Sequence, residues 1–269
     1  MIIDFHTHVF PEKIAKTTID ILAEKANNVP YTDGTVQGML DAVDRAKADI
    51  AVTLPVLTKP TQFDSVTKFA KAINDEYSHK GNKLISFGGM HPQCDDIEGK
   101  MAYLKLLGFK GVKIHPDYQN TYIDDDGYIK ILTTAKKLDM IVVTHAGVDD
   151  GYLDQPVKCP PERVLKVIEQ VGHSKFVLAH YGGHKQWDKV LEILAGKGVY
   201  FDTAYTLHEI SEELFKKILS KHGDDKILFA TDCPWRDIKS DVEIIKSYNL
   251  GKEIEDKIFY KNAKKLLNI

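Results

Sequence analysis

The sequence predicts an α/β protein, a parallel (β/α)8 barrel of the TIM type, formed as a single domain by residues 1–269. Two observations predict it: short apolar runs alternate with amphipathic segments along the whole chain, and there are eight such runs. Runs that are apolar at nearly every position are typical of parallel strands buried on both faces, and eight of them close a barrel. An open doubly wound sheet is the alternative, but no Gly-rich phosphate-binding turn follows the first run.

The eight apolar runs are the expected strands. In chain order they are residues 1–5, 50–54, 84–87, 111–114, 140–144, 176–179, 199–201 and 227–230. The segments between them are expected to be helices because apolar residues recur there at spacings of three and four, most clearly at 128–138 and 164–171. Pro160 and Pro161 suit a helix start, and residues 251–267 predict one more amphipathic helix.

Composition and charge exclude several classes of function. The chain has 36 Lys and Arg against 39 Asp and Glu, which gives a net charge of -3 and no basic excess for binding nucleic acid. No leader peptide and no run of about 18 apolar residues is visible, so neither export nor membrane association is expected. Three scattered cysteines favour a reducing compartment. We therefore expect a cytoplasmic protein that acts on a small molecule.

Metal-capable side chains recur at the C-terminal ends of the predicted strands. In chain order these side chains are His6, His8, Lys113, His115, His145, His180 and Asp232. In a parallel barrel these strand ends meet at one mouth. Because alternate strand residues point the same way, His6 and His8 can both face inward and chelate one ion. Imidazole and carboxylate ligands without cysteine favour zinc, while manganese, iron and nickel stay open.

The remaining histidines carry weaker signals. His79, His173 and His222 lie in helical or helix-end stretches rich in charge and are expected at the surface. Three more histidines follow predicted strands: His91, His184 and His208. For each of them, a position at the rim of the barrel without a function and a contact with substrate are equally good interpretations.

Five short motifs at the strand ends occur together in one order. They are IDFHTH (3–8), GVKIHP (111–116), THAG (144–147), LAHYGG (178–183) and TDCPW (231–235). In combination they resemble the amidohydrolase superfamily, most closely the amidohydrolase-related group that includes aminocarboxymuconate semialdehyde decarboxylase. The resemblance spans essentially the whole chain and implies a distorted (β/α)8 barrel. Since His6 lies near the first residue, we expect no flanking β-sandwich of the kind that larger relatives carry.

The resemblance also implies roles for individual residues. It implies that four residues bind a divalent metal: His6, His8, His145 and Asp232. His180 would stand beside the metal as an acid/base group, and Asp232 would also move a proton to the leaving group. Metal-bound water, with a pKa lowered to about 7, would attack a carbonyl carbon. The expected function is thus a metal-dependent hydrolase acting on an amide, ester or lactone.

Other functions are weighed against this one. A metal-dependent decarboxylase, which is a lyase acting on a small unsaturated or aromatic carboxylic acid, could use the same residues. A TatD-like nuclease is disfavoured, because such enzymes resemble one another in a glutamate on the fourth strand, where this chain has Lys113. A metal-binding protein without catalysis is disfavoured by the complete ligand set.

Lys113, His115 and Arg236 are expected to bind the substrate, with their positive charge directed at a carboxylate. Some amidohydrolases carry a fourth-strand lysine that forms a carbamate with carbon dioxide and bridges two metals. An ordinary ammonium group would instead repel a nearby divalent ion. We expect one metal per chain with Lys113 on the substrate side, and two metals if Lys113 is carboxylated. The sequence leaves the substrate and homo-oligomerisation open.

Overall fold

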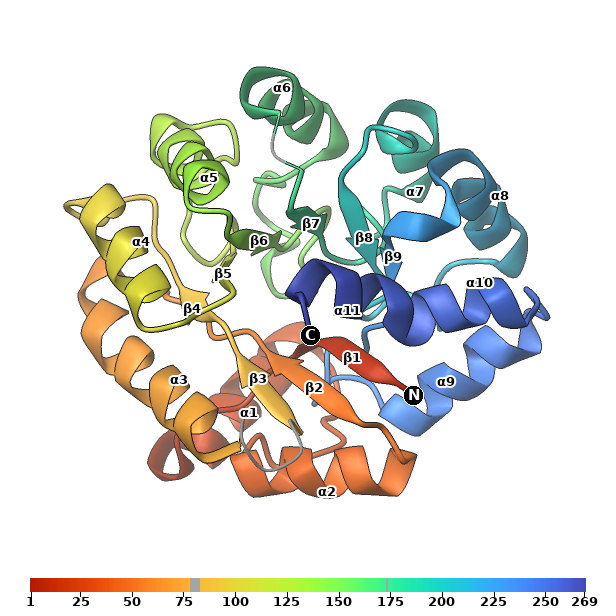
Figure 1. The fold of residues 1–269 in the computed structure, drawn as a ribbon, viewed down its shortest axis with the longest axis horizontal. Coiled ribbons are helices and arrows are strands. Elements are labelled where there is room, and N and C mark those ends of the chain that lie inside the picture. The colour runs from red at the N-terminus through yellow and green to blue at the C-terminus, as the bar shows by residue number, and fades with distance from the viewer. Residues whose placement is uncertain (78–82, 173) are drawn as a thin grey trace.

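Parallel strands surrounded by helices form a barrel in the computed structural model, which describes residues 1–77, 83–172 and 174–269 (Figure 1). One sheet has the order β1 (Ile3–Thr7), β2 (Ile50–Thr53) and β3 (Leu84–Ser86). The other has the order β4 (Gly88–Gly89), β5 (Gly111–Ile114), β6 (Ile141–Thr144), β7 (Phe176–Leu178), β8 (Tyr200–Asp202) and β9 (Ile227–Leu228). The predicted barrel is confirmed; the third predicted strand, 84–87, corresponds to β3, and β4 follows it as a strand that the sequence did not predict.

Backbone hydrogen bonds join residues 5–8, at the end of β1, to the segment that follows β9, and so connect the two ends of the barrel wall. Phe5 N donates to Phe229 O at 2.9 Å, Asp232 N to His6 O at 2.8 Å, and His8 N to Cys233 O at 2.7 Å. These bonds place the two predicted metal-ligand segments, the end of β1 and the segment after β9, side by side.

A one-residue shift in the pairing of β1 with β2 between Asp4 and Thr7 changes the direction of the β1 side chains. Phe5 packs in the apolar interior of the barrel, and His6 also reaches inward, to Asp202 of β8. The strand runs two residues beyond the predicted end, so His6 lies on β1 itself. Without the bulge, strict alternation would turn Phe5 and His6 to opposite faces.

Helices cover the outside of the barrel (Figure 1). In chain order they are α1 (Glu12–Ala26), α2 (Val36–Ala46), α3 (Phe63–Tyr77), α4 (Ile97–Leu106), α5 (Asp126–Lys137), α6 (Pro161–Val171), α7 (Trp187–Lys189), α8 (Glu212–His222), α9 (Ile238–Ser247), α10 (Lys252–Asp256) and α11 (Asn262–Leu267). The predicted start of α6 at Pro161 agrees with the structure, where that proline is the first helical residue. A π-helical turn, Lys257–Lys261, links α10 to α11. The predicted final helix, 251–267, is therefore present as a continuous helical segment from residue 252 to residue 267.

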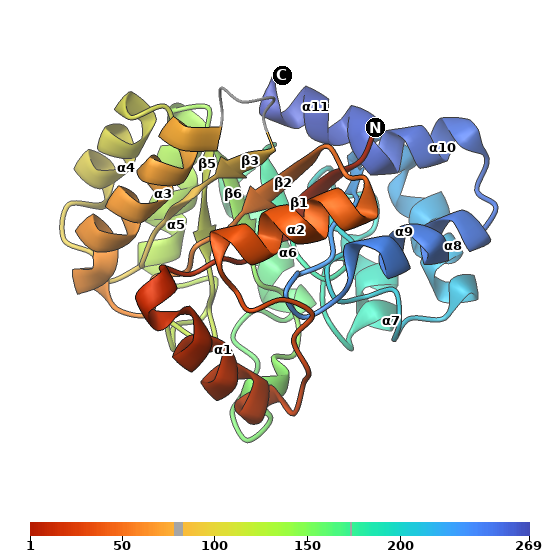
Figure 2. The ribbon, with the colours of Figure 1, turned by 90° about the horizontal axis from the view of Figure 1, so that it is seen from below.

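Two apolar layers stabilise the barrel, and they follow the alternation of the strands. On β6, Ile141 and Val143 face the barrel interior while Val142 packs against the helices. The inner layer continues into α11 through Ala263, Leu266 and Leu267, so α11 closes the N-terminal end of the barrel. In Figure 2 α11 lies at the end that carries both termini, and α1 lies at the opposite end.

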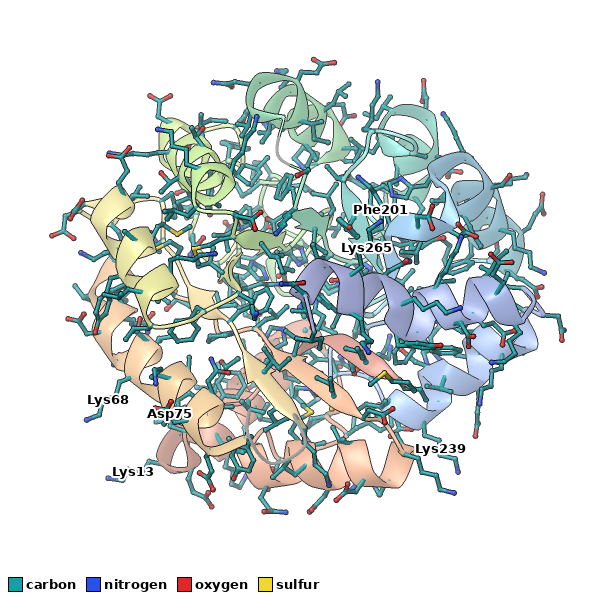
Figure 3. The ribbon with its side chains drawn as sticks, in the orientation of Figure 1. Lys13, Lys68, Asp75, Phe201, Lys239 and Lys265 are labelled. Atoms are coloured by element: carbon teal, nitrogen blue, oxygen red, sulfur yellow. The ribbon has the colours of Figure 1, made fainter. Side chains whose placement is uncertain are left out.

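Charged side chains occupy the outer surface. Lys13, Lys68 and Lys239 are exposed and point away from the barrel in Figure 3. Among the described residues, no helix combines the length and the apolar character needed to cross a bilayer.

The surface prediction for three histidines has mixed outcomes. His222 is half-buried, because its ring stacks on Phe201 at 3.9 Å and its Nε2 donates to Val199 O at 3.0 Å, so the surface prediction is wrong for this residue. His79 and His173 lie outside the described residues.

Candidate metal centre and active site

A cavity of about 220 Å³ opens at the C-terminal ends of the strands. Its wall includes every metal-capable side chain that the strand ends predict: His6, His8, Lys113, His115, His145, His180 and Asp232. Apolar side chains complete the wall, among them Phe10, Leu22, Val148 and Trp235. The barrel mouth thus combines a polar floor with an apolar surround, as small-molecule sites commonly do.

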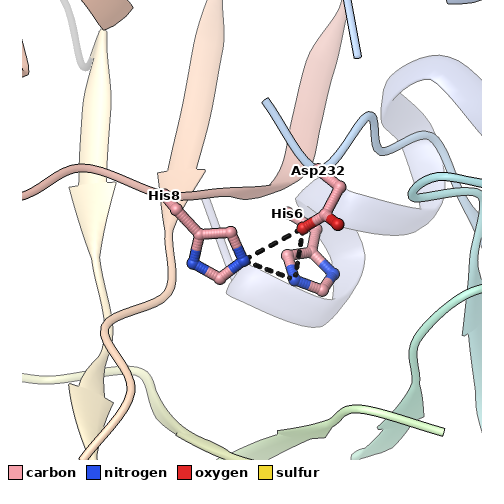
Figure 4. A group of neighbouring side chains, drawn as sticks. All are labelled: His6, His8 and Asp232. Atoms are coloured by element: carbon pink, nitrogen blue, oxygen red, sulfur yellow. Dashed lines mark hydrogen bonds and ion pairs between the residues drawn. The ribbon is translucent and has the colours of Figure 1, made fainter. Parts of the chain in front are cut away.

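His6, His8 and Asp232 form the tightest group of possible ligands (Figure 4). The two Nε2 atoms are 3.2 Å apart, and Asp232 Oδ1 lies 3.3 Å from His6 Nε2 and 3.0 Å from His8 Nε2. Burial opposes ionisation of Asp232, but the neighbouring His8, His180 and Lys113 side chains hold its pKa below the usual value. Three electron-donating atoms therefore converge on one point.

The contacts of Nδ1 in His6 and His8 determine that Nε2 of each ring faces the possible metal position. His8 Nδ1 donates to Leu54 O at 2.9 Å, so its Nε2 presents a lone pair. His6 Nδ1 lies 2.9 Å from Asp202 Oδ2, and His6 Nε2 accepts a hydrogen bond from Lys113 Nζ at 2.9 Å. A carboxylate behind a ligating histidine is the usual support for a metal site. Two imidazole nitrogens and one carboxylate oxygen fit a divalent transition metal.

His145 lies beside His180 and outside this tightest group. His180 Nδ1 donates to Ala204 O at 2.9 Å, so His180 Nε2 accepts a hydrogen bond from His145 Nδ1, also at 2.9 Å. That arrangement leaves His145 Nε2 buried and without a hydrogen-bond partner in the described part of the chain, 3.9 Å from Asp117 Oδ2. His145 belongs to a second group of possible ligands with His115 and Asp149. Its place in the metal site stays a prediction.

His180 and Asp232 have left-handed backbone conformations, with φ of 58° and 69°. Such conformations are costly for residues with a Cβ and gather at functional sites. Here they are held by hydrogen bonds from His180 N to Asp202 Oδ1 at 3.0 Å and from Asp232 N to His6 O at 2.8 Å. Burial lowers the pKa of His180 to about 4, so its imidazole is neutral near pH 7.

Lys113 contacts the group of possible ligands directly. Its side chain is fully buried, and its Nζ reaches His6 Nε2. Burial lowers the pKa of Lys113 to about 8, against the opposing effect of Asp202 and Asp232. The structure thus places Lys113 against a predicted metal ligand as well as in the cavity wall.

The other two predicted substrate residues lie apart from each other. His115 lines the cavity, with its ring stacked on His145 at 4.3 Å and on Tyr118 at 3.9 Å. Arg236 is absent from the wall: its guanidinium lies over the Tyr205 ring at 3.7 Å and pairs with Glu209 at 3.1 Å. Of the three histidines with two interpretations, His184 lines the cavity, and His91 and His208 do not.

Comparison with known proteins agrees with the family resemblance and the fold. A family model described as amidohydrolase matches residues 3–269. The chain belongs to the amidohydrolase family. No curated protein sequence matches this amidohydrolase.

Solved structures of similar fold share only low identity with the amidohydrolase. A 2,6-dihydroxybenzoate decarboxylase from Rhizobium has a TM-score of 0.67 at 15% identity, covering 99% of this chain and 98% of the other. A 5-carboxyvanillate decarboxylase from Novosphingobium aromaticivorans, complexed with manganese, has 0.72 at 13%, covering 100% and 96%. A probable 2-pyrone-4,6-dicarboxylic acid hydrolase from Acinetobacter baumannii has 0.69 at 18%, covering 100% and 99%. At such identities the likeness shows the fold.

The amidohydrolase has polar site residues that the sequence interpretation missed. Asp202 holds His6 through Oδ2, and its Oδ1 accepts from the backbone N of His180 and of Ala204. Asp202 directly follows the seventh apolar run, and this position could have predicted it, since the other site residues also follow strands. Asp149 lies in the loop after β6, where no periodicity marks it.

Proposed function

We propose that this amidohydrolase is a metal-dependent decarboxylase of a small aromatic or unsaturated carboxylic acid. The observation that carries the proposal is the convergence of His6 Nε2, His8 Nε2 and Asp232 Oδ1 within about 3 Å in a cavity with neutral His180. Support for decarboxylation over hydrolysis comes from the similar structures, of which several are decarboxylases of aromatic acids.

His6, His8 and Asp232 would hold the metal, with His145 as the fourth residue that the family resemblance implies. Bound there, a divalent ion supplies Lewis-acid stabilisation of negative charge on the substrate. Zinc is the ion we expect from the imidazole-rich set, and manganese is the alternative because the similar 5-carboxyvanillate decarboxylase contains it. We favour one ion per chain.

His180 is the residue that we assign to proton movement. Decarboxylation breaks the bond between the carboxyl carbon and the adjacent carbon, releases carbon dioxide, and puts a proton in its place. Ala204 O engages His180 Nδ1, so proton exchange would take place at Nε2, where it would replace the hydrogen bond from His145 Nδ1. Since burial keeps His180 neutral near pH 7, it would first take up a proton from solvent at Nε2 and then give that proton to the carbon from which carbon dioxide departs. The apolar wall at Leu22, Val148 and Trp235 suits an unsaturated ring.

Hydrolysis of an amide, ester or lactone is the second candidate. A probable dicarboxylic acid hydrolase shares the fold over the whole chain, and the same donors and base suit activation of water. The assay that separates the two uses protein loaded with zinc or manganese and a panel of carboxylated aromatics, amides and lactones. Release of carbon dioxide with loss of one carboxylate supports the decarboxylase. A hydrolysis product without carbon dioxide assigns the hydrolase, and full metal occupancy without turnover of any compound contradicts both.

The state of Lys113 is tested in the same preparation. With one metal, we expect Lys113→Ala to weaken substrate binding or turnover while metal content stays near one per chain. Two metals per chain, together with a mass increase on Lys113 that matches one bound carbon dioxide, would assign the carbamate instead. We also propose a cytoplasmic location, since Cys94, Cys159 and Cys233 are all free and buried.

A further inference from the structure

We infer that Asp149 selects substrates that carry a hydrogen-bond donor, such as a hydroxyl or amino group, and that it rejects substrates with a second carboxylate. The inference rests on the proposed function, because it assumes that one carboxylate of the substrate occupies the floor of the cavity beside His6, His8 and Asp232. It deepens that function by naming the class of acid that fits.

The cavity wall has its positively charged side chain at the floor and two negatively charged side chains in the loop after β6. Among the described residues that line the cavity, Lys113 is the one lysine or arginine, and it is engaged with His6. Asp149 and Asp150 line the cavity from the loop after β6. A second substrate carboxylate near that loop would therefore meet like charge.

The nearby cations lie outside the cavity wall, although Lys185 pairs with Asp150 and the charge of Lys25 acts on Asp149. Lys185 Nζ pairs with Asp150 at 2.6 and 2.8 Å. Arg236 pairs with Glu209, and Lys25 Nζ lies 3.2 Å from the centre of the Tyr152 ring. All three are absent from the cavity wall.

Asp149 and Asp150 differ in how far their oxygens are satisfied. Both oxygens of Asp150 contact Lys185, and His184 Nε2 lies 3.4 Å from one of them. Asp149 Oδ1 accepts from Gly151 N at 2.8 Å, but the polar contact of Asp149 Oδ2 within residues 1–77, 83–172 and 174–269 is His115 Nε2 at 3.5 Å. That distance is long for a hydrogen bond, so Oδ2 keeps acceptor capacity at the cavity wall. A largely buried carboxylate gains most from a new donor, and a hydroxyl or amino group supplies one.

His115 cannot easily move to satisfy Asp149 itself. Its ring is stacked between His145 and Tyr118, and its Nδ1 accepts from Tyr118 N at 3.3 Å. The apolar side chains Leu22 and Val148 also line the cavity. The chemistry that fits is an unsaturated ring with one carboxylate and a hydroxyl or amino substituent.

The test measures binding, so it does not depend on turnover. Metal-loaded protein is titrated by calorimetry at pH 8 with benzoate and with its 3- and 4-hydroxy, 3- and 4-amino, and 3- and 4-carboxy derivatives. Burial raises the pKa of Asp149 to about 6, so its carboxylate is ionised at pH 8. We expect the best hydroxy or amino derivative to bind at least about tenfold more tightly than either dicarboxylate.

Variants separate Asp149 from the rest of the loop. Asp149→Asn removes the charge and should reduce the preference to about threefold or less, while Asp149→Glu keeps the charge and should retain it. Asp154→Asn makes the same change at an exposed residue of the same loop, away from the cavity wall, and should leave the preference unchanged.

Several outcomes overturn the inference. They are a dicarboxylate that binds as tightly as the hydroxy and amino acids, a preference that survives Asp149→Asn, and the absence of binding by every probe. If the preference appears as expected but no acid is decarboxylated, the proposed function fails while the role of Asp149 stands.

Discussion

The two ends of the barrel interior are filled by opposite kinds of side chain. At the N-terminal end, Ile3 and Leu228 pack with Leu266 and Leu267 of α11 in an apolar layer. At the C-terminal end, His6, His8 and Asp232 bring electron-donating atoms within 3.0 to 3.3 Å of one another. The contrast teaches that the apolar end stabilises the fold, while the polar end holds the side chains that we propose as metal ligands.

The change occurs within single strands and on a single face. On β6 the inward residues are Ile141 and Val143, and the next inward position is His145. Beyond β9, Ala230 joins the inner apolar layer and Asp232 lines the cavity. Substitutions at the polar end should therefore change metal binding and turnover, and substitutions at the apolar end should change the free energy of unfolding.

The largest effect on the site is expected from His6→Ala. Loss of one of three converging donors should lower the metal content of protein purified without added metal by more than about tenfold. Elemental analysis measures it, and circular dichroism should show that the barrel remains folded, because the apolar end is unaltered. His222→Gln, outside the cavity, is the control and should keep its metal. Full occupancy in the His6→Ala protein would contradict the assignment.

His180→Asn should act on the rate without removing the metal. If His180 moves protons at Nε2 and is not a ligand, turnover should fall by about 10²–10⁴ while metal content stays at the wild-type level. Steady-state assays and elemental analysis on the same samples check both statements. Unchanged turnover would exclude His180 from the mechanism, and loss of metal would make it a ligand.

The contrast between the two ends also shows what the sequence could predict. The alternation of apolar runs and the polar residues at their ends were enough for the barrel and for seven side chains of the cavity wall, but Asp149 and Asp202 were missed and Arg236 lies outside that wall. The bulge in β1 was not predictable, because it depends on pairing between Asp4 and Thr7 and a neighbouring strand. The left-handed conformations of His180 and Asp232 likewise depend on hydrogen bonds between distant segments. The contact of Lys113 with His6 was not predictable either, because it joins two residues that are 107 positions apart in the sequence.

Asp202→Asn should have an intermediate effect, since Asp202 acts on the site through His6. The amide of asparagine would place a donor against His6 Nδ1 and favour the tautomer whose proton sits on Nε2, the atom that faces the other donors. We expect metal affinity to fall by about 10–100-fold. Competition with a chelator measures it, and Asp154→Asn serves as the exposed control. Wild-type affinity in the Asp202→Asn protein would show that this carboxylate does not orient the ligand.

The smallest effect on the site, and a large effect on stability, is expected from Leu266→Ala. Leu266 is 4% exposed and packs with the inner layer at the closed end, so truncation leaves a cavity and should cost about 2–5 kcal/mol of unfolding free energy. Leu106→Ala, at an 83% exposed position of α4, should change it by no more than about 0.5 kcal/mol. Urea titration measures both, and metal content and turnover of the folded Leu266→Ala protein should equal those of the wild type. A loss of metal from that protein under conditions where it remains folded would show that the apolar end positions the ligands, and that the two ends are not independent.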